Sequence, residues 1–254
     1  MSRRTGLSLV LLTALSFILL APALLAVAPS PELIEKWRTE GILDQKLAWL
    51  NSLKGAGIDT PSAHPAWNKE HYVAAAAINV NAVDTVKLLV VLVQFSDNQF
   101  SSPSGGIVNA FDSILFSDHT KAGPKNPSGS MIDYYRETSY GKLLVQGFIY
   151  GPYTAPNPYT YYVGTDNGFS HSPELVQEAL TLGQNDIPFN NFVDFGTTLV
   201  PNVAVIHAGV GAEGGGGGIW SHKSSIGSLM LKGFSFGDYN MDPELSSPGM
   251  LSQF

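Results

Sequence analysis

The sequence contains no cysteine among its 254 residues, so disulfide frameworks and cysteine-ligated metal sites are excluded. Charged residues are also scarce, at 14%, and no segment is rich in lysine or arginine. Because phosphate binding requires a concentrated basic surface, this composition and the formal net charge of −7 argue against a nucleic-acid partner. Hydrophobic residues make up 44% of the chain, which is enough to build a sizeable core.

Several motifs of common catalytic sites are missing as well. No two of the six histidines are four residues apart, the spacing that turns two imidazoles toward a metal from one helical face. The sequence contains neither a Gly-x-Ser-x-Gly elbow nor a Gly-x-x-x-x-Gly-Lys-Ser/Thr phosphate loop. Residues 1–254 therefore offer no catalytic residue and no metal ligand that the motifs identify.

The first 28 residues have the pattern of a signal peptide. Arg3 and Arg4 form a basic start, Leu7 to Leu20 is an apolar segment, and Ala26-Val27-Ala28 is a small-x-small cleavage signal. The apolar segment is short for a membrane span. We therefore expect an exported, extracellular protein with no stable membrane span after cleavage.

Residues 29–84 are predicted to form a helical region followed by a linker. Apolar residues recur at helical spacing on either side of Gly41, which predicts two short helices between Pro31 and Lys54. The apolar residues are Leu33, Ile34 and Trp37 before the glycine, and Leu43, Leu47 and Leu50 after it. Residues 55–83 lose this periodicity and resemble a linker. The region is either a pro-segment of a secreted enzyme or a simple N-terminal helical extension.

A domain with mixed strands and helices is expected from residue 85 onward. Val86 to Phe95 is a nearly continuous apolar run, typical of a central strand buried on both faces. Ser130 and Asp133 have the spacing of a capping box that starts a helix, and Gly141 would end that helix. Further elements are predicted as a helix over 107–115, a strand over 143–150, a loop over 151–164, a helix over 172–183 with Ser172 as its N-cap, a strand over 203–206 and a β-rich segment over 229–239.

The loop over 151–164 is rich in tyrosine and proline. Its tyrosines either line a binding cleft or cover the core while keeping their hydroxyl groups hydrated, and we favour the second interpretation. They are Tyr153, Tyr159, Tyr161 and Tyr162.

The stretch from Asn202 to Lys223 organises the rest of the chain. A buried strand is followed by the glycines Gly214 to Gly218, and a second short strand is predicted to begin at Ile219 and Trp220. Such a strand–loop–strand unit either keeps a sheet edge open to a ligand or is an ordinary long hairpin.

Two clusters of polar residues have the chemistry of cation ligands. His207, Glu213 and His222 flank the glycine loop and could converge on a cation, although nothing in the sequence fixes their geometry. Near the C-terminus, an acidic group could bind a hard cation such as calcium, but a solvated acidic turn is the interpretation we favour. That group consists of Asp238, Asp242 and Glu244.

Five segments together resemble the immune inhibitor A family of secreted zinc metallopeptidases, peptidase family M-six. The order and spacing of the segments agree over about 85–245. The segments are VVLVQFSD (90–97), MIDYYRETSYGKLLVQG (131–147), the pair IHAG (206–209) and GGIWSHK (217–223), and YNMDPEL (239–245). A signal peptide, helical pro-region and catalytic domain are also the layout of this family.

The resemblance implies a zincin-like α/β (α+β) fold with a twisted mixed sheet of four or five strands and packed helices, incomplete at its C-terminus. Residues 85–254 would be the N-terminal part of the catalytic domain. In the family, a His-Glu-x-x-His helix supplies the zinc ligands and the glutamate base shortly after the Pro-Glu stretch. This sequence stops at Phe254, before that helix, so we expect a truncated sequence that is inactive alone, with zinc bound only by the full-length enzyme.

The resemblance also assigns a role to the stretch after the glycine loop. In zincin folds an edge strand above the active-site helix holds an extended substrate by strand addition. That strand would contain the expected substrate-binding residues, and the substrate would be a protein or peptide. The expected substrate-binding residues are Gly218, Ile219, Trp220, Ser221 and His222. For His222, a hydrogen-bonded structural histidine is the alternative. For the whole chain, the alternative is a non-catalytic exported module that binds a polypeptide or glycan.

Overall fold

The computed structural model describes residues 29–55, 83–101, 106–117, 129–194, 196–215, 217–247 and 250–251. The predicted signal peptide and nearly all of the predicted linker lie outside these residues. Within the described ranges, no helix is both long and apolar enough to cross a bilayer.

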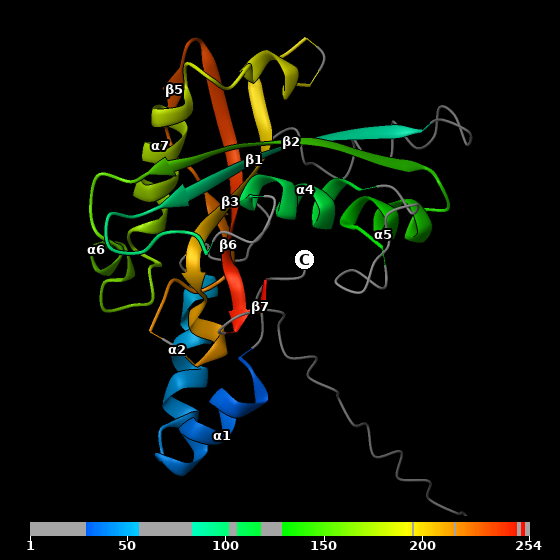
Figure 1. Cartoon of the computed structure of the whole chain (residues 1–254). Helices are drawn as coiled ribbons and strands as arrows, with labels where there is room; N and C mark the ends of the chain where they lie inside the picture. The colour runs from blue at the N-terminus through cyan, green and yellow to red at the C-terminus, as the bar shows by residue number, and fades with distance from the viewer. Residues whose placement is uncertain are drawn as a thin grey trace, which may run out of the picture.

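A twisted mixed β-sheet forms the centre of the molecule (Figure 1). Five strands follow one another in the order β2-β1-β3-β6-β4, and two short strands, β5 and β7, pair with β6. The first four strands in this order are parallel, whereas β4 runs antiparallel to β6 at the edge. The strands are β1 (Asp84–Gln94), β2 (Leu143–Thr154), β3 (Leu199–Val210), β4 (His222–Ser225), β5 (Met230–Leu231), β6 (Phe234–Ser247) and β7 (Met250–Leu251). The predicted α/β fold with a mixed sheet is confirmed.

The helices cover both faces of this sheet, and one pair lies at its end (Figure 1). They are α1 (Pro31–Thr39), α2 (Leu43–Gly55), α4 (Ile107–Phe116), α5 (Met131–Thr138), α6 (Tyr159–Val163) and α7 (Ser172–Gly183). The described residues also include the 3₁₀ turns η3 (Phe189–Asn191) and η4 (Ala212–Gly214).

Strand β1 lies between two cores because its side chains alternate between the faces of the sheet. Leu89, Val91 and Val93 pack with the buried face of α7. Val90 and Leu92 point the other way and pack with α4. All five side chains are fully buried, as the continuous apolar run predicts for a central parallel strand.

The helix α5 begins where the sequence indicates. The Ser130 hydroxyl accepts the Asp133 N–H at 3.3 Å, and the Asp133 carboxylate accepts the Ser130 N–H at 3.0 Å. This reciprocal pair is the predicted capping box. After the helix, Gly141 adopts φ +75° and donates its N–H to the Arg136 carbonyl, which ends α5 as predicted.

Three local predictions are wrong in detail. The segment 151–164 is not simply a loop, because β2 continues to Thr154 and α6 forms over Tyr159–Val163. Ser172 is the first residue of α7 rather than its N-cap, and its hydroxyl donates to the Gly168 carbonyl at 2.7 Å. In α2, Leu47 is 37% exposed, and Leu50 is the residue that is fully buried.

The β-rich segment near the C-terminus is a hairpin followed by a long strand. Lys232 and Gly233 both have positive φ, at 51° and 86°, as a tight two-residue hairpin turn requires. They connect β5 to β6, which continues to Ser247. Because β6 is parallel to β3, both strands end at the same side of the sheet, beside η4 and the glycine loop.

Candidate functional site

The candidate site lies where β3 and β6 end and the glycine loop leads into β4. Glu213, in η4, is the centre of its hydrogen bonding and is only 8% exposed. Its carboxylate accepts the Ser221 hydroxyl at 2.6 Å and the Ser221 N–H at 3.3 Å. A Cβ on Gly211 would collide with this carboxylate, so the turn into η4 requires glycine. The two ends of the glycine loop are thereby tied together.

The five predicted substrate-binding residues lie together on this loop and at the start of β4, and all five are buried. The strand begins at His222, however, three residues after the predicted start at Ile219. The intervening amides have partners within the chain. Ile219 donates to the Tyr159 hydroxyl oxygen at 3.2 Å, and Trp220 donates to the Asn167 carbonyl at 2.9 Å. The loop is therefore held by hydrogen bonds from its own amides before β4 starts.

The backbone of β4 has an inner and an outer side. The Ile226 N–H donates to the Gly237 carbonyl at 3.1 Å. Because bonded residues alternate along an antiparallel pair, the backbone groups of His222 and Ser224 face β6, while those of Lys223 and Ser225 point away from it. Among the described strands, β4 is the last of its sheet on that side. This side of β4 has the geometry that strand addition requires.

His222 has partners on both ring nitrogens. Nδ1 lies 2.6 Å from the Trp220 carbonyl oxygen, and Nε2 lies 3.0 Å from the Tyr239 hydroxyl. Its ring also packs on Phe169, with centroids 4.9 Å apart. These contacts fit the alternative of a hydrogen-bonded structural histidine.

His207 is fully buried at the end of β3. Its Nδ1 lies 2.9 Å from the Ala208 carbonyl oxygen, and its Nε2 has no hydrogen-bond partner among the described residues. Burial lowers the pKa of His207 to about 4, so the ring is neutral at physiological pH. The described residues contain no group of three or more histidines and carboxylates able to hold a metal. The hypothesis that His207, Glu213 and His222 converge on a cation is therefore not supported.

The acidic group near the C-terminus lies in strand β6 and not in a turn, so the favoured interpretation is wrong. Glu244 is 1% exposed and accepts hydrogen bonds from the amides of Ser101 (2.8 Å) and Gly209 (3.1 Å). Asp238 forms an ion pair with Lys223 at 2.8 Å. Burial and, to a smaller extent, the nearby Glu213 carboxylate together raise the pKa of Asp242 to about 7. Pairing with β3 overrides the turn preference of these residues.

Three of the four tyrosines of the predicted loop cover the core, as expected, but their hydroxyl groups, which we expected to be hydrated, bond to groups of the protein. Tyr162 is fully buried and donates to Glu178 at 2.5 Å. Tyr159 packs on Phe95 and donates to the Val210 carbonyl at 3.3 Å, and Tyr153 donates to Asp186 at 3.3 Å. Burial raises the pKa of each of these three phenols to about 12. They remain neutral hydrogen-bond donors under ordinary conditions.

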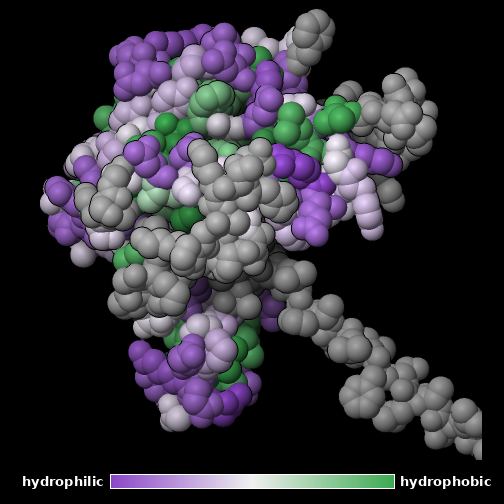
Figure 2. Space-filling model, turned by 45° about the vertical axis from the view of Figure 1, so that its right-hand side comes forward, coloured by the Kyte–Doolittle hydropathy of each residue, from purple (hydrophilic) through white to green (hydrophobic). Residues whose placement is uncertain are grey.

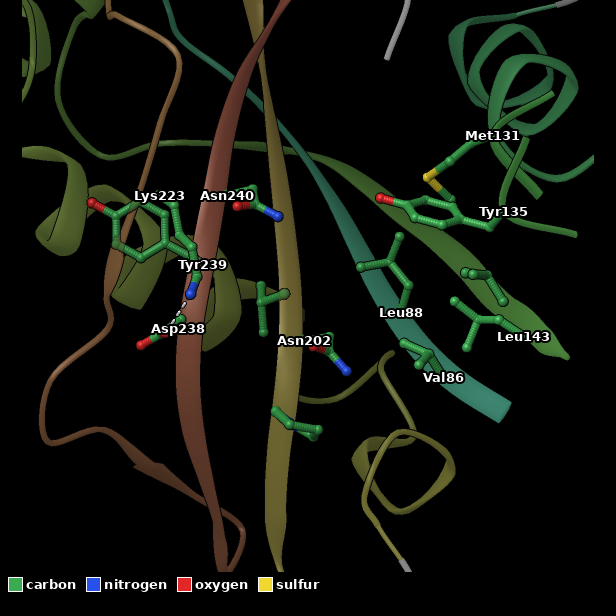
Figure 3. Close-up of a pocket in the computed structure, with 13 residues that line it drawn as sticks. Val86, Leu88, Met131, Tyr135, Leu143, Asn202, Lys223, Asp238, Tyr239 and Asn240 are labelled. Atoms are coloured by element: carbon green, nitrogen blue, oxygen red, sulfur yellow. Dashed lines mark ion pairs between the residues drawn. The ribbon is translucent and has the colours of Figure 1, made fainter. Parts of the chain in front are cut away.

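A cleft of about 380 Å³ lies on the sheet face that carries α5 (Figure 3). One side is apolar and comes from β1, β2 and α5; it includes Leu88, Met131 and Tyr135. The other side is polar and includes Asn202, Asn240 and the Lys223–Asp238 ion pair. The sequence interpretation missed this cleft. The alternation of polar residues at 238, 240, 242 and 244 is the signal that one face of β6 is not apolar.

Comparisons with known proteins find bacterial relatives of part of the chain, although no protein-family model matches it. Over 193 residues the chain is 28% identical to "Pre-pro-metalloprotease PrtV" of Vibrio cholerae serotype O1, in two strains. It is also 28% identical over 179 residues to "Immune inhibitor A" of Bacillus thuringiensis subsp. alesti. These alignments cover 62% and 56% of this chain but only 21% and 26% of the relatives. The chain is thus similar to a bacterial protein named as a metalloprotease and to an immune inhibitor A, and it spans about a quarter or less of their length.

Proposed function

We propose that this chain is part of a secreted zinc metalloendopeptidase that hydrolyses peptide bonds in proteins. The observation that carries the proposal is the 193-residue similarity to a named metalloprotease. Because the alignment covers 21% of that relative, the activity is proposed for a longer protein to which these residues contribute. In that protein, residues 1–28 act as the signal peptide, 29–84 form a helical pro-region with its linker, and 85–254 form the N-terminal part of a zincin-like catalytic domain.

The described residues do not fit a catalytic zinc. Such a site needs three protein ligands and an open position, and no group of three histidines or carboxylates is available among them. We assign the zinc to a His-Glu-x-x-His helix that follows residue 254 in the complete protein, and we assign no step of hydrolysis to this chain. Calcium would likewise need other ligands, because Asp238 and Glu244 already have an ion pair and hydrogen bonds, respectively.

The proposed role of this chain is to hold the substrate. An extended peptide can add to the outer side of β4, where the backbone groups of Lys223 and Ser225 point away from β6. Gly218 to His222 form the start of this substrate-binding edge. Since the amides of Ile219, Trp220 and Ser221 have partners within the chain, these residues would shape the edge, and the main-chain pairing would fall to β4.

The proposed activity is tested on the secreted protein in its native length. Its zinc content is measured by elemental mass spectrometry, and hydrolysis of dye-labelled casein is followed with and without a zinc chelator. We expect stoichiometric zinc, together with hydrolysis that the chelator abolishes and added zinc restores. Hydrolysis that persists after complete removal of zinc would contradict the proposal.

A second candidate function is a non-catalytic exported module that binds a polypeptide or glycan. The cleft of Figure 3 favours it, because an apolar wall with Tyr135 faces amide groups of Asn202 and Asn240 across the sheet. Such a module would bind its ligand without cleaving it. The casein assay separates the two functions, since a binding module leaves the substrate intact with or without zinc.

A further inference from the structure

The strand β2 forms the edge of the sheet on the side away from β4 (Figure 1). Among the described strands it is the last one on that side, because it pairs with β1 and with no other strand. In Figure 2, green hydrophobic residues reach the surface in the upper part of the molecule, where Figure 1 places β1 and β2, whereas α1 and α2 below are mainly purple. The proposed substrate-holding role uses β4 and leaves this second edge without a function.

The backbone of β2 has one side that faces β1 and one side that faces outward. The Lys142 carbonyl accepts the Asp84 N–H at 2.8 Å, so the backbone groups of Lys142 face β1. The Leu143 amide points the other way and donates to the Ser139 hydroxyl oxygen at 2.9 Å. Because this direction alternates along a strand, every second residue after Leu143 presents its N–H and C=O outward. These residues are Val145, Gly147 and Ile149.

This edge lacks the features that usually keep sheet edges from pairing. Natural edge strands are short or carry charged residues, prolines or bulges. Residues 143–150, LLVQGFIY, contain no charged residue and no proline. The first proline is Pro152, where the register between β1 and β2 also shifts. By contrast, β4 has 4 residues and includes Lys223. The regular part of β2 is therefore open to pairing with another strand.

Large aromatic side chains are exposed along the same edge. Phe148 is 60% exposed and meets Phe192 edge to face, with centroids 6.3 Å apart. Gln146 is exposed as well and lies on the same face of the sheet, because the two residues are two positions apart. In the turn before β2, Tyr140 is 91% exposed. A strand added to β2 would cover apolar surface of Phe148 in addition to pairing with the backbone.

A second copy of this chain offers an edge that matches the first. If two β2 strands run antiparallel about a two-fold axis at Gly147, the outward groups of Val145 in one copy lie opposite those of Ile149 in the other. The residue on the axis is glycine and has no side chain that could collide with its own copy. Since residues 143–150 are uncharged, the two edges do not repel each other.

The side chains match under the same symmetry. Phe148 of one copy lies opposite Gln146 of the other, and the two Phe148 rings are diagonal neighbours, within reach of aromatic side chains. The turn with Tyr140 then meets the segment around Pro152 of the second copy, and both of these residues are exposed in the single chain. This complementarity of the edge with itself favours a second copy over an unrelated strand.

We propose that two copies of this chain associate through antiparallel pairing of their β2 strands, which joins the two sheets into one continuous sheet. The β4 edges lie at the two outer ends of the joined sheet and stay open to peptides. The dimer goes beyond the proposed peptidase function and does not depend on it, because β2 and β4 are opposite edges.

The test uses the secreted protein in its native length. Sedimentation-velocity ultracentrifugation measures its mass at protein concentrations up to about 100 µM. Hydrogen exchange read by mass spectrometry follows the amides of residues 143–150 at low and high concentration. We expect the mass of two chains at high concentration, and slower exchange of this segment as the concentration rises.

Two substitutions at the edge and a matched control refine the test. Phe148→Lys and Gln146→Glu each bring like charges together near the two-fold axis, so each should weaken association at least tenfold while circular dichroism shows a folded protein. An equimolar mixture of the two variants places lysine opposite glutamate and should associate again. A variant that had merely lost its fold would not recover on mixing. Met230→Lys adds the same charge at a 62% exposed apolar position in β5, away from β2, and should associate like the wild type.

The mass of a single chain at every concentration would overturn the proposal. If residues 143–150 were then protected from exchange at all concentrations, another segment of the same protein would be the partner of β2. Association that neither Phe148→Lys nor Gln146→Glu weakens would overturn it as well, because the contact would lie elsewhere. None of these measurements requires zinc or hydrolysis, so a failure of the dimer is distinguishable from a failure of the peptidase assignment.

Discussion

The Ser221 hydroxyl donates a 2.6 Å hydrogen bond to the Glu213 carboxylate and thereby ties the two ends of the glycine loop together. The same carboxylate accepts the Ser221 amide at 3.3 Å, and the Glu213 carbonyl accepts the Ser30 amide at 3.1 Å. Glu213 therefore connects η4, the start of β4 and the residue that precedes α1. The position of the edge strand depends on this buried contact.

Loss of this carboxylate should destabilise the fold. Glu213→Ala leaves the buried Ser221 hydroxyl and amide without their acceptor, which costs about 1–3 kcal/mol. Glu213→Gln retains one acceptor oxygen and should cost less. Urea denaturation monitored by tryptophan fluorescence gives the free energy of unfolding of each variant. If Glu213→Ala unfolds at the same urea concentration as the wild type, the contact does not stabilise the loop.

The partly buried Asp242, whose carboxyl has a raised pKa, should make stability depend on pH. Its pKa is raised from 3.8 to about 7, so the folded state holds its proton more tightly than the unfolded state. The contribution of this carboxyl to the free energy of unfolding is fully present below pH 4 and is lost as the pH rises to about 7. The lowered pKa of His207 acts in the opposite direction, because its contribution is present above pH 6.5 and is lost as the pH falls toward 4.

Asp242→Asn isolates the contribution of the carboxyl. Between pH 4 and pH 7, the variant should gain stability relative to the wild type by at most about 4 kcal/mol, at about 1.4 kcal/mol per unit of pKa shift. Urea denaturation of both proteins at several pH values measures this difference. A difference that stays constant across the range would show that the Asp242 carboxyl does not titrate with a raised pKa.

The capping box of α5 offers a test of local stability. Ser130→Ala removes the side-chain acceptor of the Asp133 amide and should lower the free energy of unfolding by about 1 kcal/mol. Thr138→Ala, at an exposed position near the end of the same helix, is the matched control. Thermal unfolding followed by circular dichroism compares them. Equal melting temperatures for the two variants would argue against a stabilising cap.

The outer side of β4 is tested in the native-length enzyme. Ser225→Pro removes an amide that points away from β6, whereas Ser225→Ala keeps this amide and removes only the hydroxyl. Loss of one main-chain hydrogen bond of about 1 kcal/mol should raise KM for a peptide substrate several-fold in the proline variant, with kcat little changed. The alanine variant should resemble the wild type. Unchanged KM in Ser225→Pro would place the substrate elsewhere.

The sequence predicted elements whose signals are local. The apolar run that became β1 and the Ser130–Asp133 box that starts α5 depend on neighbouring residues, and both are confirmed. The predicted stop signal is also local, because α5 ends at Thr138 and Gly141 adopts a positive φ in the turn that follows.

The remaining features depend on tertiary contacts that a single sequence does not display. The segment with Asp242 and Pro243 suggested a turn, but pairing with β3 holds it as a strand. Trp37 indicated an apolar helical face without revealing that its partner is Trp220, far along the chain. The cleft likewise combines residues from β1, α5 and β6, which no single segment indicates.

The central claim is that these residues belong to a longer zinc peptidase, and the intact mass and peptide map of the native secreted protein test it most directly. The account predicts a mass well above that of the 254 residues and a peptide map that continues past Phe254 into a His-Glu-x-x-His segment. A native protein whose mass and last peptide both end at Phe254 would contradict the peptidase assignment and favour a binding module.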